Sequence, residues 1–189
     1  HDFQYPDRIV IGTLDKKSTA ILKKIYRGID GPIVTISPTV AEMIKYVSNA
    51  LLATKISFAN EIGNVCKKVG IDVYDVMGAV GMDHRISQYF LQAGAGFGGS
   101  CFPKDVAALV SFGSSKGLGM FLLDAVTAVN DNQPLKMIEL LEKHVSHIKD
   151  KKIAVLGLAF KPGTDDIKGI PIYPSHTGIV TQGGPGCCF

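Results

Sequence analysis

The feature that most constrains the fold is a stretch of about thirty residues, from Ser37-Pro38 to Gly70, with the pattern of one long helix. Serine followed by proline is a typical helix start, and glycine is a typical stop. Apolar residues occupy much of the circumference, so this helix has to be covered on several sides. The sequence therefore predicts a helical domain in which the long helix is a domain spine, an oligomer interface, or both.

Patterns on either side of this helix belong to an α/β fold. Residues 8–12 form a short apolar run closed by glycine and predict a strand, an amphipathic helix follows over residues 20–25, and residues 33–36 predict a second strand. A chain that opens strand–helix–strand resembles the last part of an α/β domain. Residues 151–160 return to the pattern of a buried parallel strand and predict the start of a second such domain.

The middle of the chain is predicted to be helical. Four further helices are expected, over residues 72–80, from Pro103 to Gly113, over 120–129 and over 135–148. Beyond residue 173 the composition shifts to glycine, proline and serine, and we expect a loose tail there.

Composition narrows the functional class. The 189 residues carry 20 Lys and Arg against 17 Asp and Glu, which is too even for a protein whose main task is to grip nucleic acid or an anionic membrane. No apolar run reaches the ~18 residues of a membrane span, and the first residues do not resemble a secretory signal, so a cytoplasmic protein is expected. The four cysteines lack the spacing of a zinc site, and we expect free thiols and no bound metal.

The most informative chemical group is Cys101, which follows four glycines in six residues and precedes Pro103 at a predicted helix start. Helix N-terminal amides and the nearby Lys104 favour a thiolate, which would be a nucleophile. A small buried residue in a tight turn is an equal alternative. Asp105 could be a general base, although a helix cap or a solvated first-turn acid is favoured from the residues alone.

Other polar residues leave their alternatives open. Lys45 and Asn49 lie four residues apart on a largely apolar helix face. If this face is buried, the lysine ammonium needs a partner; the alternative is that the lysine extends from a partly exposed face. Arg85, near Tyr89 and Phe90, could hold a phosphate or lie on the surface. His144 and His147 favour a charged helix C-terminus over a metal pair, and Cys66 is expected in the core. No Gly-x-Gly-x-x-Gly fingerprint follows the first predicted strand, so this chain's own motifs do not argue for a nucleotide cofactor.

Three segments resemble one family. Residues 96–105, Gly-Phe-Gly-Gly-Ser-Cys-Phe-Pro-Lys-Asp, resemble the catalytic-cysteine motif of the UDP-glucose/GDP-mannose dehydrogenases. Residues 42–49 resemble the family's Lys-x-x-x-Asn element, and residues 156–166 resemble the entry into its C-terminal domain. The resemblance spans roughly residues 5–168, and the Phe-Pro after Cys101 favours members that oxidise UDP-glucose over those that oxidise GDP-mannose.

The resemblance implies NAD-dependent oxidation of the sugar C6 alcohol to a carboxylate in two hydride transfers, through a thiohemiacetal and a thioester on a cysteine. It also implies a homodimer through the long helix. The implied catalytic residues are Cys101, Lys45, Asn49 and Asp105. The implied substrate-binding residues are Arg85, Tyr89, Phe90, Gly94, Gly98, Phe160 and Lys161. The implied cofactor-binding residues are Lys104 and Lys168.

The chain departs from the family at both ends. We expect the dinucleotide domain that the family has before this segment to be missing from this chain, and the tail to stand in place of most of the C-terminal domain. We therefore expect an internal fragment of such an enzyme, or a non-catalytic dimerisation module derived from one. The expected domains are the end of an NAD-binding domain (1–37), a central helical domain (38–133), the start of a UDP-binding domain (134–173) and a tail (174–189).

Overall fold

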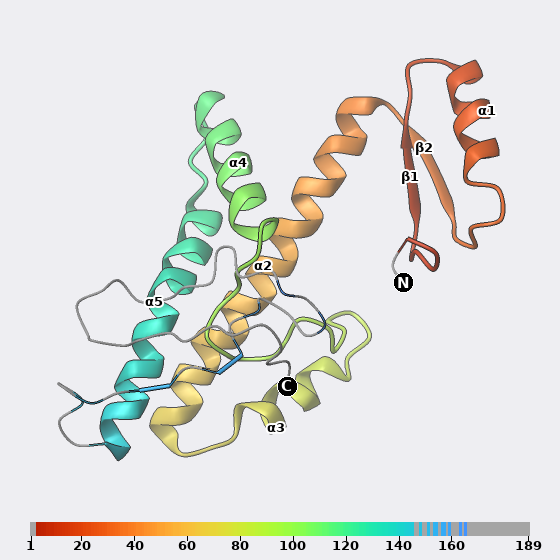
Figure 1. The fold of residues 1–189 in the computed structure, drawn as a ribbon. Helices are drawn as coiled ribbons and strands as arrows, with labels where there is room; N and C mark the ends of the chain where they lie inside the picture. The colour runs from red at the N-terminus through yellow and green to blue at the C-terminus, as the bar shows by residue number, and fades with distance from the viewer. Residues whose placement is uncertain are drawn as a thin grey trace. The chain divides into compact units, whose positions relative to one another are not determined.

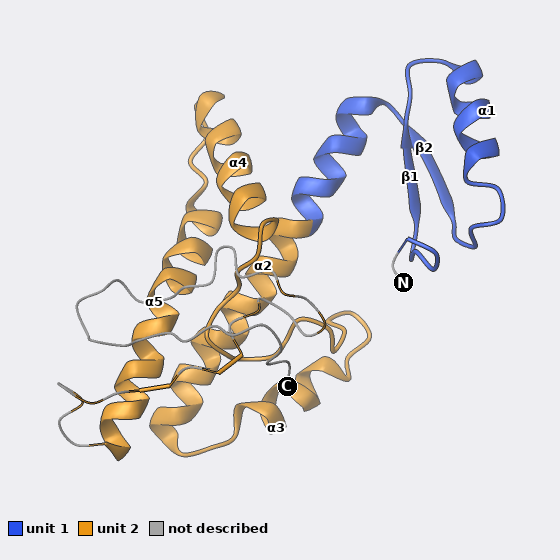
Figure 2. Ribbon diagram, in the orientation of Figure 1, with its two compact units in different colours: residues 1–48 blue, residues 49–189 orange. Residues whose placement is uncertain are grey.

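The computed structural model describes residues 3–145, together with residues 148, 151, 153, 154, 156, 157, 159, 163 and 165. Its elements are β1 (Ile9–Gly12), α1 (Lys16–Ile25), β2 (Ile33–Ile36), α2 (Pro38–Val69), α3 (Val73–Gly81), α4 (Phe102–Ser115) and α5 (Phe121–His144) (Figure 1). They form two compact units, and the boundary between Ser48 and Asn49 falls inside α2 (Figure 2).

The first unit contains the predicted strand–helix–strand. β1 and β2 pair in parallel, with Ile9 opposite Ile33 and Gly12 opposite Ile36. Asp15 caps α1 by accepting a hydrogen bond from the Ser18 backbone N–H at 2.8 Å. The Ser18 hydroxyl, which also donates to this carboxylate, lowers the pKa of Asp15.

The second unit is built on the C-terminal part of α2. One core cluster joins α2, α4 and α5, and its buried members are Ala50, Ala53, Phe97, Val106, Leu123 and Val126. A second cluster joins α2, α3 and the segment after α3, and its buried members are Ala59, Cys66, Val73, Met77 and Leu91. The alanines of α2 let the neighbouring elements approach its backbone closely, and Cys66 is core, as predicted.

The predicted mixed α/β class, with a short parallel sheet and long central helices, is confirmed. The prediction of two helices over residues 120–148 is wrong, because α5 is one helix that contains Pro134. A proline removes one backbone hydrogen bond from a helix interior, but Pro134 and the preceding Gln133 are buried, and this packing carries the helix past the proline. α4 likewise continues through Gly113 to Ser115.

Long apolar side chains remain exposed on α2. In the second unit, Leu51, Phe58, Val65 and Val69 are each more than half exposed to solvent. Spacings of seven, seven and four residues place all four on one side of the helix. The prediction that α2 is covered on several sides is therefore not met within the part of the chain that the structure describes.

The remaining predictions lie largely outside the described residues. These are the strand over residues 151–160, most of the second Rossmann-like domain and the tail. Among the described helices, none combines the length and the apolarity that a membrane crossing requires.

Candidate active site

Cys101 lies where the glycine-rich loop meets α4. It occupies the N-cap position, and Pro103 follows in the first turn, as the sequence predicts. Gly96 (φ +107°) and Gly99 (φ +80°) give the loop two left-handed residues. The thiol is exposed, with its Sγ 3.8 Å from the Ser100 Oγ, so the alternative of a buried cysteine in a tight turn is wrong.

Asp105 is buried directly behind this helix start, with 1% of its surface exposed. Its Oδ2 accepts a hydrogen bond from Asn49 Nδ2 at 2.6 Å, and its Oδ1 lies 2.7 Å from Lys104 Nζ. A buried carboxylate requires such partners on both oxygens. The expectation of a solvated first-turn acid is wrong, because the first turn of α4 faces α2 here and turns Asp105 away from water.

Lys45 precedes Asn49 by one turn of α2 and belongs to the first compact unit. Its side chain is exposed, which agrees with the alternative of a lysine that extends from an exposed helix face. Of the four predicted catalytic residues, Asn49 and Asp105 are in direct contact.

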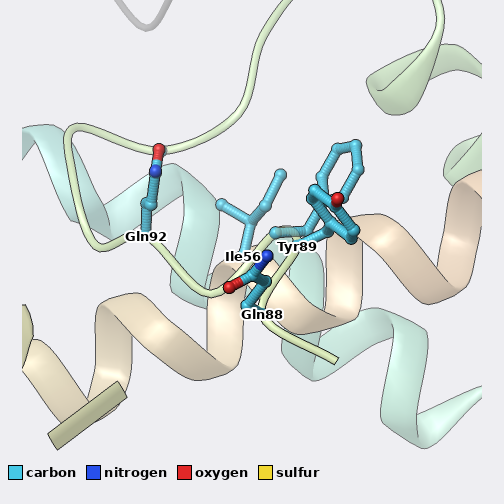
Figure 3. Close-up of a pocket in the computed structure, with 6 residues that line it drawn as sticks. Ile56, Gln88, Tyr89 and Gln92 are labelled. Atoms are coloured by element: carbon cyan, nitrogen blue, oxygen red, sulfur yellow. The ribbon is translucent and has the colours of Figure 1, made fainter. Parts of the chain in front are cut away.

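A pocket of about 620 Å³ opens beside the loop. Figure 3 shows Gln88, Tyr89 and Gln92, from the segment between α3 and α4, around Ile56 of α2. Phe90 and Gly96 complete the lining, so two predicted substrate residues, Tyr89 and Phe90, line the pocket. The predicted Gly94 and Gly98 do not, although Gly96 of the same loop does.

Aromatic contacts connect this pocket to the start of α4. The Phe102 ring packs edge-on against Phe90, with centroids 6.2 Å apart, and against Phe97 at 6.1 Å. Phe102 directly follows Cys101 in the chain. Aromatic packing through Phe102 therefore connects Phe90 in the pocket wall to the residue that follows the candidate nucleophile.

Arg85 lies on the pocket segment and is largely exposed. Its guanidinium donates to both oxygens of Asp83, at 2.6 Å for the closest pair, and this contact lowers the pKa of the Asp83 carboxyl. Lys55 of α2 donates from its Nζ to the backbone oxygens of Ile86 (3.1 Å) and Ser87 (3.3 Å). The segment that presents Arg85 is thus held from within the second unit.

Sequence reasoning missed Lys55 and a set of buried amides on α2 and α5. Asn60, Asn130 and Gln133 are each at least 93% buried, and all three bind the backbone of the glycine-rich loop. The available signal was their spacing, because each amide falls on a helix face that is otherwise small or apolar. In such a place a polar side chain needs a partner.

Several predicted residues lie outside the described part of the chain. They are Phe160, Lys161, Lys168 and His147. The residues that the structure does describe include no group of three or more His, Cys, Asp or Glu side chains arranged to hold a metal ion.

Residues 39–132 match the family model described as the UDP-glucose/GDP-mannose dehydrogenase family, central domain. The chain belongs to this family. It is 44% identical over 171 residues to the UDP-glucose 6-dehydrogenase TuaD of Bacillus subtilis (strain 168), a match that covers 90% of this chain and 37% of the relative. This family's central domain therefore accounts for α2, α3, α4 and the first part of α5.

Solved structures show the same fold. A UDP-glucose dehydrogenase from Pyrobaculum islandicum matches with a TM-score of 0.86 and 47% identity, covering 90% of this chain and 39% of that one. A UDP-D-ManNAc dehydrogenase from Pyrococcus horikoshii matches with a TM-score of 0.76 and 30% identity, covering 90% and 40%. The chain thus spans about two fifths of the length of the relatives it matches.

Proposed function

We propose that this chain carries the thiol part of the active site of a UDP-glucose 6-dehydrogenase, with Cys101 as the nucleophile. The observation that supports this most is an exposed thiol at the start of α4, one helical turn from a buried carboxylate that binds Asn49 and Lys104. The sequence identity of 42–47% to proteins named for UDP-glucose, against 30% to one named for UDP-D-ManNAc, supports this sugar. GDP-mannose is the alternative substrate.

The chain's own part in the reaction is covalent chemistry at sulfur. The Cys101 thiolate adds to the C6 aldehyde of the sugar, a C–S bond forms, and the carbonyl oxygen takes up a proton. A separate hydride acceptor would supply the two oxidations, of the C6 alcohol to this aldehyde and of the thiohemiacetal to a thioester, each with release of one proton. Water then attacks the thioester carbonyl carbon and gives up its two protons. The C–S bond then breaks, which releases the carboxylate and returns the thiolate.

Asn49 and Asp105 are proposed to act beside this sulfur. The Asn49 amide has a second N–H that could donate to a developing oxyanion, and Asp105 holds the amide in place through the 2.6 Å hydrogen bond. Asp105 would also exchange protons with the water. Lys45 is proposed, from the family resemblance alone, to stabilise the same oxyanion.

NAD⁺ is the implied acceptor of both hydrides. The described residues do not form a site for its phosphates: after β1 the chain runs Gly12-Thr13-Leu14-Asp15, without a glycine-rich turn, and Lys104 is engaged by Asp105. We therefore derive no step through the cofactor. A second candidate function, a non-catalytic dimerisation module with an intact thiol site, is supported by the exposed apolar residues Leu51, Phe58 and Val65 of α2.

A homodimer through α2 is part of the proposal. It is supported by the exposed apolar stripe of Leu51, Phe58, Val65 and Val69, which a second copy of α2 would cover.

We propose a cytoplasmic protein that binds a nucleotide sugar. We propose that it binds neither nucleic acid nor membrane, because its charge is nearly balanced. The domain limits proposed are residues 1–37, 38–133 and 134–173, with a tail beyond.

The deciding experiment measures NADH formation at 340 nm by the purified chain with UDP-glucose and NAD⁺, beside the Cys101→Ser variant. Calorimetric titration with UDP-glucose and with GDP-mannose runs in parallel. Turnover that disappears in the variant supports the enzyme. Binding of UDP-glucose without turnover supports the non-catalytic module, and the absence of both overturns the proposal for this chain.

A further inference from the structure

The glycine-rich loop ahead of Cys101 has no regular secondary structure, yet two of its residues, Phe97 and Gly99, are buried in the second unit. Gly94 to Ser100 contain neither helix nor strand, and Phe97 is 6% exposed. Buried backbone N–H and C=O groups require hydrogen-bond partners. The partners of this loop therefore have to come from side chains.

Asn130 of α5 pairs with Phe97 as a neighbouring strand would. Its Oδ1 accepts from the Phe97 N–H at 2.6 Å, and its Nδ2 donates to the Phe97 carbonyl at 3.1 Å. Both backbone groups of one buried residue are thus bound by a single amide. A Cβ atom at Gly96 would lie 2.8 Å from the Asn130 Oδ1, so the loop passes this amide too closely for any larger residue at that position.

Gly94 is held in the same way by two helices. Its N–H donates to Asn60 Oδ1 of α2 at 2.6 Å, and its carbonyl accepts from Gln133 Nε2 of α5 at 2.8 Å. Gln133 is fixed in turn, because its Oε1 accepts from Asn64 Nδ2 at 3.0 Å. Asn60 is fully buried and Gln133 is 1% exposed, so the side-chain partners of Gly94 are fixed inside the unit, although Gly94 itself is exposed.

We propose that Asn60, Asn130 and Gln133 form an amide clamp that fixes the glycine-rich loop and makes them positioning residues of the candidate site. The clamp determines where Gly96 lines the pocket and where Phe97 meets Phe102, the residue after Cys101. None of the three amides is assigned a catalytic role. They act through the loop backbone.

The test is hydrogen–deuterium exchange of the loop amides in the folded chain. In Asn130→Ala the Phe97 N–H loses its acceptor, and its protection should fall by about tenfold or more relative to wild type. Two variants serve as controls: Asn132→Ala, which removes an exposed amide of the same helix bonded only within α5, and Met77→Ala, which weakens the other core cluster.

A second variant keeps the test valid if Asn130→Ala does not fold. In Asn130→Asp a protonated carboxyl can accept from the Phe97 N–H and donate to its carbonyl, whereas the ionised form cannot donate. Protection of Phe97 relative to wild type should therefore return as the pH falls. A general loss of stability would produce no such recovery.

The clamp proposal is wrong if Phe97 exchanges no faster in Asn130→Ala than in Met77→Ala, or if Asn130→Asp shows no pH-dependent recovery. Local loss of protection confined to residues 94–100 supports it. These measurements use neither sugar nor cofactor. Failure of the clamp and failure of the proposed dehydrogenase are therefore distinguishable.

Discussion

At the scale of single residues, the two described cysteines differ mainly in access to solvent. Cys101 is exposed and Cys66 is 3% exposed. Iodoacetamide should therefore modify Cys101 at least about ten times faster than Cys66 in the folded chain, and at a similar rate in denaturant. Peptide mass spectrometry of a time course measures both rates at once. Equal rates under native conditions would contradict an accessible nucleophile at the start of α4.

The buried carboxylate provides a second test at this scale. Asp105→Ala should lower the free energy of unfolding by about 2 kcal/mol, because it leaves the half-buried Asn49 donor unpaired and opens a small cavity. Asp105→Asn, which keeps an acceptor, should cost about 1 kcal/mol. Urea denaturation measures both values.

A matched control for this pair is Asp131→Ala, at an exposed position of α5. It should stay within about 0.5 kcal/mol of wild type. A loss as large as that of Asp105→Ala would show that the measurement reports the removal of any acid and not the burial of this one.

How far these residues could be predicted depends on the range of the interactions. Cys101 at a helix start follows from the local order glycine, cysteine, proline. The burial of Asp105 does not, because it depends on Asn49, which lies 56 residues away in the chain. Asn130 and Gln133 were missed for the same reason: their partners are backbone groups, which every residue possesses and no sequence pattern marks.

At the scale of elements, we predict opposite effects on stability for alanine substitutions at two glycines. Gly96 has a φ of +107° and no room for a Cβ atom, so Gly96→Ala should destabilise the chain by at least about 1 kcal/mol. Gly78 lies inside α3 with open space where a Cβ would be, so Gly78→Ala should stabilise it by about 1 kcal/mol. Thermal unfolding compares the two, and a shift of the same sign for both would refute this interpretation of the loop.

The pocket segment between α3 and α4 depends on one lysine of α2. Lys55→Met keeps the aliphatic part of the side chain but removes the donor to the backbone oxygens of Ile86 and Ser87. We expect a protease to cleave residues 83–90 several-fold faster in this variant than in wild type. Lys55→Arg retains hydrogen-bond donors, so its cleavage rate should be closer to that of wild type. An unchanged cleavage rate in Lys55→Met would show that the conformation of this segment does not depend on Lys55.

Element boundaries were predicted well where the breaking residue is local. Pro38 and Gly70 delimit α2 because proline suits a first turn and glycine ends a helix. Pro134 led to the wrong prediction of a helix break, because a proline inside a helical pattern normally ends the helix. Only the tertiary packing around buried Gln133 and Pro134 explains why α5 continues to His144.

At the scale of the whole molecule, the proposed dimer makes a direct prediction. The double variant Leu51→Glu with Phe58→Glu places two charges on the exposed stripe of α2 and should shift the chain from dimer to monomer. Light scattering coupled to size-exclusion chromatography measures the mass. Lys67→Glu, on the opposite side of α2 and also exposed, is the control and should leave the mass unchanged. A wild-type chain that elutes as a monomer at all concentrations would exclude this assembly.

The long, apolar α2 could be recognised from sequence as a helix that needs covering, but the identity of its cover could not. Periodicity counts apolar residues on every face without telling an internal neighbour from a second copy. The structure shows which apolar residues are covered within the unit, Ala50, Ala53 and Ala59, and which are exposed, Leu51, Phe58 and Val65.

The amide clamp also affects how variants of this protein should be judged. It joins side chains to the backbone and adds no helix and no strand, so far-UV circular dichroism cannot detect it. A variant that has lost the clamp could keep the spectrum of the intact fold while the loop before Cys101 moves freely. An inactive protein of that kind would pass the usual check for correct folding, and its defect would be wrongly assigned to the chemistry of the mutated side chain.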